Sequence, residues 1–297
     1  MHLNKNMPAA QLIALMDSAG VTQSVLMARY YRGDRSGGEG SDEQALSYAK
    51  QYPGRFLPFV AGQRPELLEQ KRWLEPDEVA KKLLEQVEER LRSGEFSGLG
   101  ELIIRHHSYM IPQAAQMGSE VDIPVDTPLM RAFADLAARY QVPMTIHAEA
   151  EPRVVPGMVS LLEYNPKARI IWAHSCGRSS AKAIREMLTR HPNLFCDLGD
   201  MTRIPASGYG NYWPRQTPSI FLIEDGTGRL YDDMKALYEE FSDRFVLGTD
   251  NAHTPSLRSY EARIRRWRQL LSGLSAGTAR RLAHLNAEQL FTRKGSK

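Results

Sequence analysis

Four apolar stretches of this 297-residue chain each end in a side chain that can bind a metal ion. The stretches are GLGE, MTIH, IIWAH and FVLGTD, and the residues that end them are Glu101, His147, His174 and Asp250. Two imidazoles together with carboxylates suit a divalent transition metal that keeps one position open for water. We expect zinc in this site, with manganese as the alternative.

Each of these residues also has an ordinary explanation when it is taken alone. A buried histidine after an apolar run is commonly hydrogen-bonded in the core, and an aspartate after a strand commonly caps the next helix. Glu101 at a strand end can pair with a nearby cation such as Arg105. The placement of all four residues at the ends of strand candidates favours the metal site.

Short apolar runs alternate with amphipathic segments along almost the whole chain. We expect strands at residues 21–28, 56–62, 98–105, 142–149, 169–176, 194–200 and 245–250. We expect helices at residues 8–19, 41–52, 76–92, 126–140, 154–164, 179–190, 230–241, 255–271 and 275–290. Several strand candidates are almost continuously apolar, as parallel strands covered on both faces are.

This alternation predicts parallel βαβ units and an α/β fold. Seven strands behind a leading helix are one short of a (β/α)8 TIM barrel, so strand 1 is expected to be missing or truncated at residue 1. We find no linker or repeat that divides the chain, and residues 1–297 are expected to form a single domain. Because a barrel carries its active site at the C-terminal ends of its strands, the candidate ligands would meet there.

The chain is nearly balanced in charge, with 38 basic and 35 acidic residues and a formal net charge of +3. Its one basic cluster, RIRRWR at residues 263–268, fits the solvated face of a helix, so no nucleic-acid partner is expected. We find neither a signal peptide nor an apolar run long enough to cross a membrane. Cys176 and Cys196 are the only cysteines and indicate no disulfide framework, so a cytoplasmic location is expected.

The order of the candidate ligands resembles that of the amidohydrolase superfamily, which has Glu on strand four, His on strands five and six, and Asp on strand eight. More narrowly, the sequence is similar to the amidohydrolase 2 group in the phrases YPGRFLPF, GLGE, VPMTIHAE, RIIWAHSCG, HPNLFCDLG, RFVLGTDNAH and LNAEQLF. That group includes proteins like aminocarboxymuconate semialdehyde decarboxylase and the dicarboxylate lactonases. The resemblance extends from about Asp17 to Phe291 and implies a metal-dependent enzyme on a TIM barrel.

The resemblance also bears on the N-terminus and on the number of metal ions. The family has a His-x-His pair, commonly followed by Leu, at the end of strand one, and MHL resembles the tail of that motif. His2 would then be a further metal ligand. The binuclear members often hold two metals with a lysine on strand four, which GLGELIIR lacks, so a mononuclear site is implied. Glu101 would be a ligand, a bridge or an outer partner of that site.

For catalysis, the resemblance implies that Asp250 takes a proton from water and later passes it to the leaving group. His174 would bind the metal or polarise the substrate carbonyl, since the family uses this position in both ways. We predict a metal-dependent hydrolase that cleaves a small ester, lactone or amide. The alternatives are a nonoxidative decarboxylase of the same fold and a catalytically inactive barrel that acts as a binding protein.

Further polar residues near the presumed mouth of the barrel are candidates for substrate binding: Arg105, Glu149, Arg178 and His253. Arginine binds carboxylates through two parallel hydrogen bonds, so the expected substrate is a small acidic molecule. The alternative for each candidate is a loop residue that bonds the backbone. The aromatic loop at residues 208–221 is expected to be a lid or a contact within a homo-oligomer.

Overall fold

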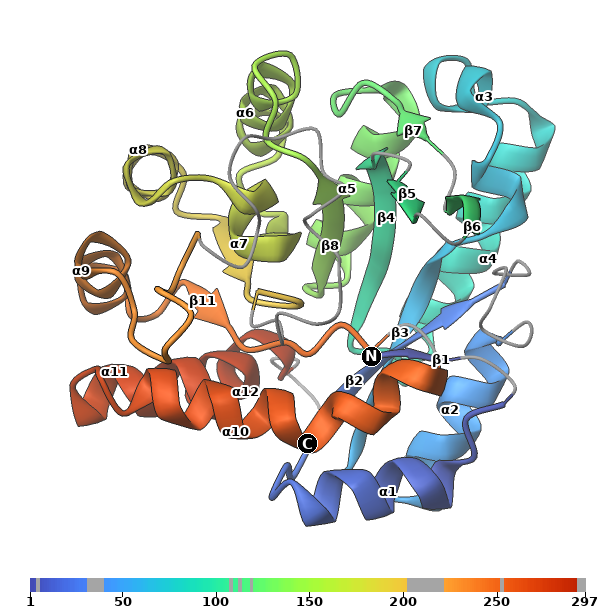
Figure 1. Cartoon of the computed structure of the whole chain (residues 1–297). Coiled ribbons are helices and arrows are strands. Elements are labelled where there is room, and N and C mark those ends of the chain that lie inside the picture. The colour runs from blue at the N-terminus through green and yellow to red at the C-terminus, as the bar shows by residue number, and fades with distance from the viewer. Residues whose placement is uncertain are drawn as a thin grey trace.

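The computed structural model describes residues 1–3, 6–30, 40–106, 109–111, 114–117, 120–201, 222–251 and 254–292, with the backbone alone at 109–111, 114–117 and 254–256. Its centre is a curved sheet of parallel strands surrounded by helices (Figure 1). In spatial order, the main strands are β1 (His2–Leu3), β2 (Ser24–Arg29), β3 (Phe56–Gln63), β4 (Gly98–His106), β8 (Pro143–Ala148), β9 (Arg169–Trp172), β10 (Leu194–Asp197) and β11 (Phe245–Val246). The order along the sheet is the order along the chain, and the fold is the TIM barrel predicted from the sequence.

Helices connect the strands and cover the outside of the sheet (Figure 1). They are α1 (Ala9–Ser18), α2 (Asp42–Gln51), α3 (Gln70–Leu74), α4 (Glu78–Arg92), α5 (Pro128–Arg139), α6 (Val155–Tyr164), α7 (Ala173–Arg178), α8 (Ala181–Arg190), α9 (Asp232–Glu240), α10 (Tyr260–Leu271), α11 (Ala276–Arg280) and α12 (Asn286–Phe291). The 3-10 helices are η1 (Pro65–Leu67) and η4 (Thr254–Ser259), and the π-helical segment η5 (Arg281–Leu285) joins α11 to α12. The hydroxyl of Ser41 accepts the N–H of Gln44 and that of Thr127 accepts the N–H of Met130. These caps explain why α2 and α5 begin where the sequence predicts.

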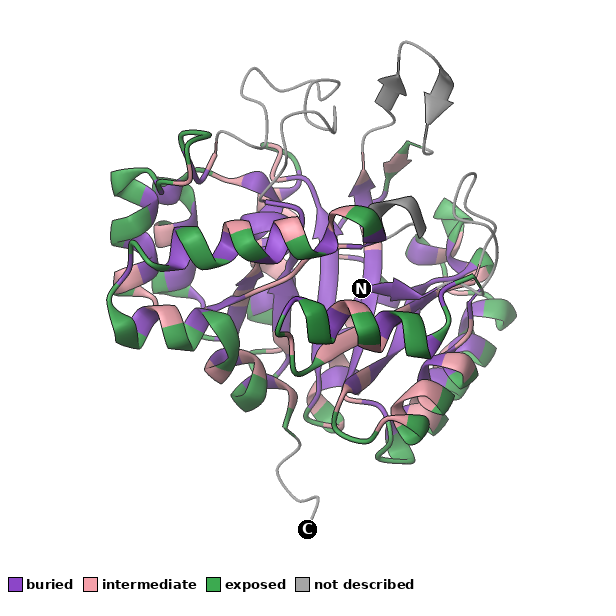
Figure 2. Cartoon of the chain, turned by 60° about the horizontal axis from the view of Figure 1, so that its bottom comes forward, coloured by how far each residue is buried: buried purple, intermediate pink, exposed green. Residues whose placement is uncertain are grey.

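Burial follows this arrangement, with buried strands inside and exposed helix faces outside (Figure 2). The largest group of buried side chains lies between the sheet and the helices, and it includes Leu99 and Ile146 of the sheet and Phe133 of α5. These side chains are at most 1% exposed. Removing this apolar surface from water is the main source of stability for such a fold.

The C-terminal helix shows how strongly the sheet curves. Phe291 of α12 packs edge-on against Phe59 of β3, with ring centroids 5.5 Å apart. Leu290 of the same helix packs with Ile171 of β9 and Val246 of β11. Because β3 lies far from β9 and β11 in the strand order, one short helix can touch all three only if the sheet curls round it.

The two ends of the sheet meet beside the first strand. The two residues of β1 pair in parallel with β2, with His2 in register with Met27. On the other side, the backbone N–H of His2 donates to the carbonyl of Asn251 at 2.9 Å. This contact places His2 next to the segment that carries Asp250.

The structure differs from the predicted elements at several strand ends and in the segment that follows β4. The helix expected at residues 275–290 is also divided into α11, η5 and α12. The strands expected to reach residues 176, 200 and 250 end at Trp172, Asp197 and Val246. The expected ranges included His174 (φ 57°), Asp200 (54°) and Asp250 (46°), whose positive φ values do not fit an extended strand. The segment between residues 105 and 126, for which no element was expected, also contains strands. They are β5 (Tyr109–Ile111) and β6 (Ala114–Met117), which pair with each other, and β7 (Val121–Asp122), which pairs antiparallel with β4. The loop at 208–221 lies outside the described residues.

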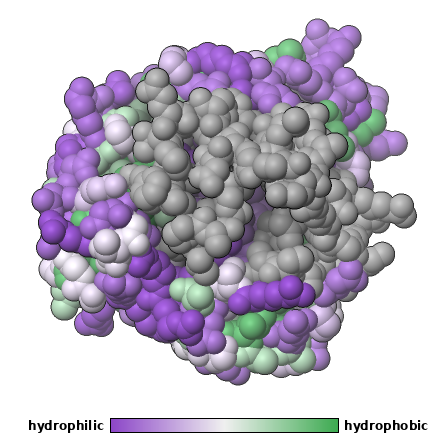
Figure 3. Space-filling model, in the orientation of Figure 1, coloured by the Kyte–Doolittle hydropathy of each residue, from purple (hydrophilic) through white to green (hydrophobic). Residues whose placement is uncertain are grey.

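The described surface in the view of Figure 3 is mostly hydrophilic, with small hydrophobic patches. Within the described residues, we find no helix with the length and apolar character needed to cross a bilayer. The basic cluster of α10 is paired with acidic groups: Arg263 contacts Asp200 and Arg266 contacts Glu224. The expectation of a solvated face is wrong for Arg263, which is 9% exposed because its ion pair holds it against the barrel.

Candidate metal centre

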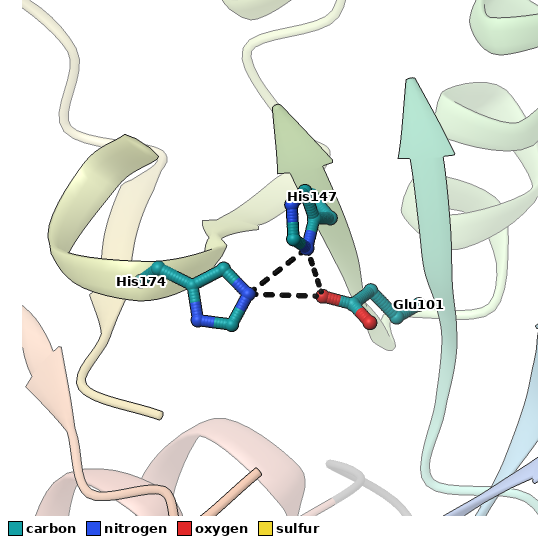
Figure 4. A group of neighbouring side chains, drawn as sticks. All are labelled: Glu101, His147 and His174. Carbon is teal, nitrogen blue, oxygen red and sulfur yellow. Dashed lines mark hydrogen bonds and ion pairs between the residues drawn. The ribbon is translucent and has the colours of Figure 1, made fainter. Parts of the chain in front are cut away.

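Three of the predicted ligands point toward one another (Figure 4). Glu101 lies within β4, His147 lies near the C-terminal end of the neighbouring β8, and His174 lies in the turn that follows β9. Oε1 of Glu101 lies 3.2 Å from Nδ1 of His147 and 3.6 Å from Nε2 of His174. The two imidazole nitrogens lie 2.9 Å apart. All three residues are buried, so salt and water screen their interactions only weakly.

The spacing of these three atoms fits a bound divalent ion. Ligands that lie about 2.0–2.1 Å from a tetrahedral ion are about 3.3 Å from one another. The observed separations range from 2.9 to 3.6 Å. A carboxylate oxygen and two ring nitrogens are also donors that zinc and manganese accept. In spacing and in type, these residues fit the expected ion.

His2 lies against the other oxygen of the same glutamate and joins it to Asp250. Nε2 of His2 is 3.2 Å from Oε2 of Glu101 and 3.1 Å from Oδ1 of Asp250. The side chain of Asp250 is 25% exposed, whereas those of His2 and Glu101 are 4% and 7% exposed. The five predicted ligands therefore form one network, and Asp250 is its most open member.

His174 reaches the network from a left-handed turn. Residues 174–178 of α7 all have φ between 50° and 70°, a conformation that costs each non-glycine residue about 1–2 kcal/mol. Nδ1 of His174 lies 2.9 Å from the carbonyl oxygen of Gly199. Because a carbonyl only accepts, Nδ1 carries the proton and Nε2 turns its lone pair toward Glu101 and His147.

A disulfide between Cys176 and Cys196 joins this turn to β10. The expectation that the two cysteines form no disulfide is therefore wrong. Strands β9 and β10 are neighbours, and they bring the two Cα atoms to 5.0 Å, within the range that a disulfide can span. The cysteine content thus no longer argues for a reducing compartment.

Two predicted substrate residues form a buried ion pair. A guanidinium N–H of Arg178 donates to Oε1 of Glu149, and both side chains are 0% exposed. The same Oε1 lies 3.5 Å from Nε2 of His147. Burial would raise the pKa of Glu149, but Arg178 and His147 outweigh it and lower the pKa to about 2. Glu149 is therefore an ionised carboxylate on the outer side of His147.

The other two substrate candidates have different outcomes. Arg105 is 5% exposed, and its guanidinium contacts Glu120 and, at 3.1 Å, Glu151. Its charge is therefore already shared by two carboxylates at the end of β4. His253 lies outside the described residues.

The sequence reasoning missed two residues of this network. Nε2 of Gln63 donates to Oε2 of Glu101 at 3.2 Å and lies 3.2 Å from Nδ1 of His2. A carboxylate oxygen of Asp197 accepts the backbone N–H of Gly199, whose carbonyl oxygen faces His174. Burial, together with the nearby Glu101 and Asp250, raises the pKa of Asp197. Gln63 and Asp197 each end an apolar run, FLPFVAGQ and LFCD. The signal that identified the other candidates could have found both.

The network is strongly coupled electrostatically. Burial would raise the pKa of Glu101, but His147 and His2 hold it well below its usual range. Burial would lower the pKa of His147, but Glu101 and Glu149 raise it to about 9. Burial would also raise the pKa of Asp250, but His2 holds it well below its usual range. The metal-free site therefore pairs ionised carboxylates with a protonated imidazole, whose proton a metal ion would replace.

The sequence pattern of the amidohydrolase family, in its second group, matches residues 5–293, so the chain belongs to this family. The resemblance inferred from the sequence motifs is confirmed. No curated protein matches the sequence.

The chain is also similar to several solved structures. One is an uncharacterized TIM-barrel protein from Bordetella bronchiseptica, with a TM-score of 0.60 and 16% identity, covering 95% of this chain and 81% of that chain. Another is a probable 2-pyrone-4,6-dicarboxylic acid hydrolase from Acinetobacter baumannii with citric acid bound (TM-score 0.54, 14% identity, 95% and 88% covered). A third is a dihydroxybenzoic acid decarboxylase from Polaromonas sp. JS666 with bound manganese and an inhibitor (TM-score 0.53, 13% identity, 95% and 85% covered). At these identities the likeness shows the shared fold.

Proposed function

We propose that the protein is a metal-dependent hydrolase that cleaves a small ester, lactone or amide. The proposal rests on the donor atoms of Glu101, His147 and His174, which lie 2.9–3.6 Å apart beside the partly open carboxylate of Asp250. Residues 1–297 would act as one catalytic barrel. Zinc is the expected ion and manganese the alternative, which the manganese bound to the Polaromonas decarboxylase supports.

A bound divalent ion would supply Lewis acidity, which acidifies water and polarises a substrate oxygen. Asp250 would accept a proton from water and return it to the leaving group, since its low pKa keeps it ionised and its side chain is 25% exposed. His2, 3.1 Å away, holds one oxygen of that carboxylate. The bond from Nδ1 of His174 to Gly199 keeps the other ring nitrogen aimed at the site.

A small acidic substrate fits this proposal. The related hydrolase from Acinetobacter was solved with citric acid bound. In this chain, Arg105 is the cation at the end of β4, and a substrate carboxylate would compete there with Glu120 and Glu151.

A nonoxidative decarboxylase is the second candidate, because the Polaromonas decarboxylase has the same fold and holds a metal ion. It would use the same ligands on an acidic aromatic or unsaturated substrate. The third candidate is a barrel that binds a metal and an acidic molecule without turning it over.

The test is turnover by the metal-loaded protein in ¹⁸O-enriched water, with one panel of lactones, esters and amides and one of aromatic carboxylic acids. Hydrolysis places ¹⁸O in the carboxylate product, whereas decarboxylation releases carbon dioxide. Asp250→Asn should lower kcat at least about 100-fold. Asp243→Asn is the control, because Asp243 is exposed and pairs only loosely with Arg244, at 3.9 Å. Unchanged turnover in Asp250→Asn would contradict the assigned role, and no turnover of either panel would favour the binding protein.

A further inference from the structure

We propose that Glu149, fixed by Arg178, is a positioning residue that keeps the proton of His147 on Nε2, so that Nδ1 is offered to the metal ion. The inference rests on the proposed metal site and extends it to two residues that the sequence had suggested for substrate binding. The ring nitrogen of His147 that is free of a proton binds the metal ion, and the position of that proton therefore affects how tightly the ion is held.

The imidazole of His147 has two different sides. Its Nδ1 lies 3.2 Å from Oε1 of Glu101 and 2.9 Å from Nε2 of His174, on the side of the proposed ion. Its Nε2 lies 3.5 Å from Oε1 of Glu149, on the opposite side. A neutral imidazole has one N–H and one lone pair. For Nδ1 to bind a metal, the proton must be on Nε2, where a carboxylate faces it.

Glu149 is held in place from several directions. Arg178 donates to its Oε1, and neither side chain has any exposed surface. The backbone N–H of Glu149 donates to the carbonyl of Arg105 at 3.2 Å, and the N–H of Ala150 donates to the carbonyl of Gly177 at 3.0 Å. A carboxylate that is fixed in this way can hold a ligand imidazole in one orientation and one tautomer.

The arrangement also links the two histidines. Arg178 and His174 stand at the two ends of the same left-handed turn, residues 174–178. The turn presents Nε2 of His174 to the site directly, and through Arg178 and Glu149 it sets the ring of His147. One local backbone conformation thus positions both imidazoles that face Glu101.

Two other roles for the ion pair make different predictions. Direct substrate binding needs accessible surface, and the side chains of Glu149 and Arg178 have none. A purely structural ion pair would affect stability without affecting metal affinity. A matched pair for comparison is Glu224 with Arg266, in which Glu224 is 2% exposed and, among the described residues, bonds Arg266 and none of the five predicted ligands.

The first test is metal affinity, measured by titrating zinc into metal-free protein in competition with a chelator. In Glu149→Leu/Arg178→Met both charges are removed together, so no buried charge is left unpaired. We expect zinc affinity to fall about 10–100-fold in this variant. Glu149→Gln keeps an acceptor oxygen and should lie between it and the wild type. The control Glu224→Leu/Arg266→Met should bind zinc as the wild type does.

The second test needs no variant that could fail to fold. In the zinc-loaded wild type with ¹⁵N-labelled histidine, NMR spectra that correlate ring nitrogens with carbon-bound protons report the state of each nitrogen. We expect His147 to show a protonated Nε2 and an unprotonated Nδ1. The opposite tautomer would overturn the inference, as would wild-type affinity in both Glu149 variants. A wild type that binds neither zinc nor manganese would instead overturn the proposed function, and with it this inference.

Discussion

At the scale of single residues, the chemistry of the site depends on what the carboxylates do to the imidazoles. Glu101 and Glu149 lie on opposite sides of His147, at 3.2 Å and 3.5 Å from its two nitrogens. They outweigh the effect of burial and raise the pKa of His147 to about 9. Below that pH the metal-free protein therefore carries a proton where the proposed ion would bind.

This raised pKa predicts that metal binding releases a proton at pH 7.5 and becomes tighter as the pH rises toward 9. Titration calorimetry of zinc in buffers with different ionisation enthalpies measures the number of protons released. The stability of the metal-free protein should change in the opposite direction. The contribution of a protonated His147 is fully present below its unfolded pKa, about 6.5, and is lost as the pH rises through about 9. Zinc affinity that does not vary between pH 6 and 9 would rule out this assignment.

At the scale of elements, the left-handed turn at residues 174–178 is the most unusual feature of the fold. Gly177 has φ +70°, and a Cβ at this position would lie 2.5 Å from the carbonyl oxygen of Ala148 and 2.7 Å from the nitrogen of Ala150. A side chain would therefore disturb the junction between β8 and the turn, where His147 and His174 are positioned.

Gly177→Ala is predicted to lower the free energy of unfolding by roughly 2–4 kcal/mol, from the cost of a left-handed alanine and of overpacking. Gly277→Ala in α11 is the control, because a Cβ there has no atom within 4 Å. It should raise stability by up to about 1 kcal/mol, since alanine favours a helix over glycine. Urea unfolding of the metal-free proteins measures the free energy of unfolding of both variants. If Gly177→Ala were as stable as the wild type, the left-handed conformation at residue 177 would be contradicted.

The disulfide between Cys176 and Cys196 also fixes the conformation of this turn. It closes a loop with a sequence separation of 20 residues, for which the chain-entropy estimate of stabilisation is about 3 kcal/mol. Cys176→Ser/Cys196→Ser should lose about this amount in urea unfolding. A reductant should destabilise the wild type and leave the double variant unchanged. A wild type that does not respond to reductant, with its thiols free by titration, would show that the bond is absent.

The sequence predicts the regular elements because their causes are local. Apolar periodicity and capping residues such as Ser41 and Thr127 identify α2 and α5 within one or two residues. The turn at His174 is different. Only Gly177 within it favours a left-handed conformation by itself, and the others are held by contacts with β8 and β10. Such contacts exist only after the strands have assembled, so the sequence continued the strand to residue 176.

At the scale of the whole molecule, the barrel brings together side chains that are 248 positions apart, from His2 to Asp250. The sequence located the candidate ligands because each ends an apolar run, and the strand order of the barrel then brings them together. The sequence did not distinguish side chains that face the centre of the metal site from side chains that lie behind the ligands. Glu149 and Arg178 look like site residues in the sequence, yet their orientation depends on burial and on the turn.

Metal content per chain, measured by elemental analysis after dialysis against a weak chelator, decides whether Glu101, His147 and His174 hold an ion. We expect about one zinc or manganese ion per chain in the wild type and a large loss of metal in His147→Ala and His174→Ala. His284→Ala should keep its metal, since His284 is exposed and pairs with Glu288 at 2.8 Å. A wild type without metal, or variants of His147 and His174 that retain it fully, would contradict the metal centre.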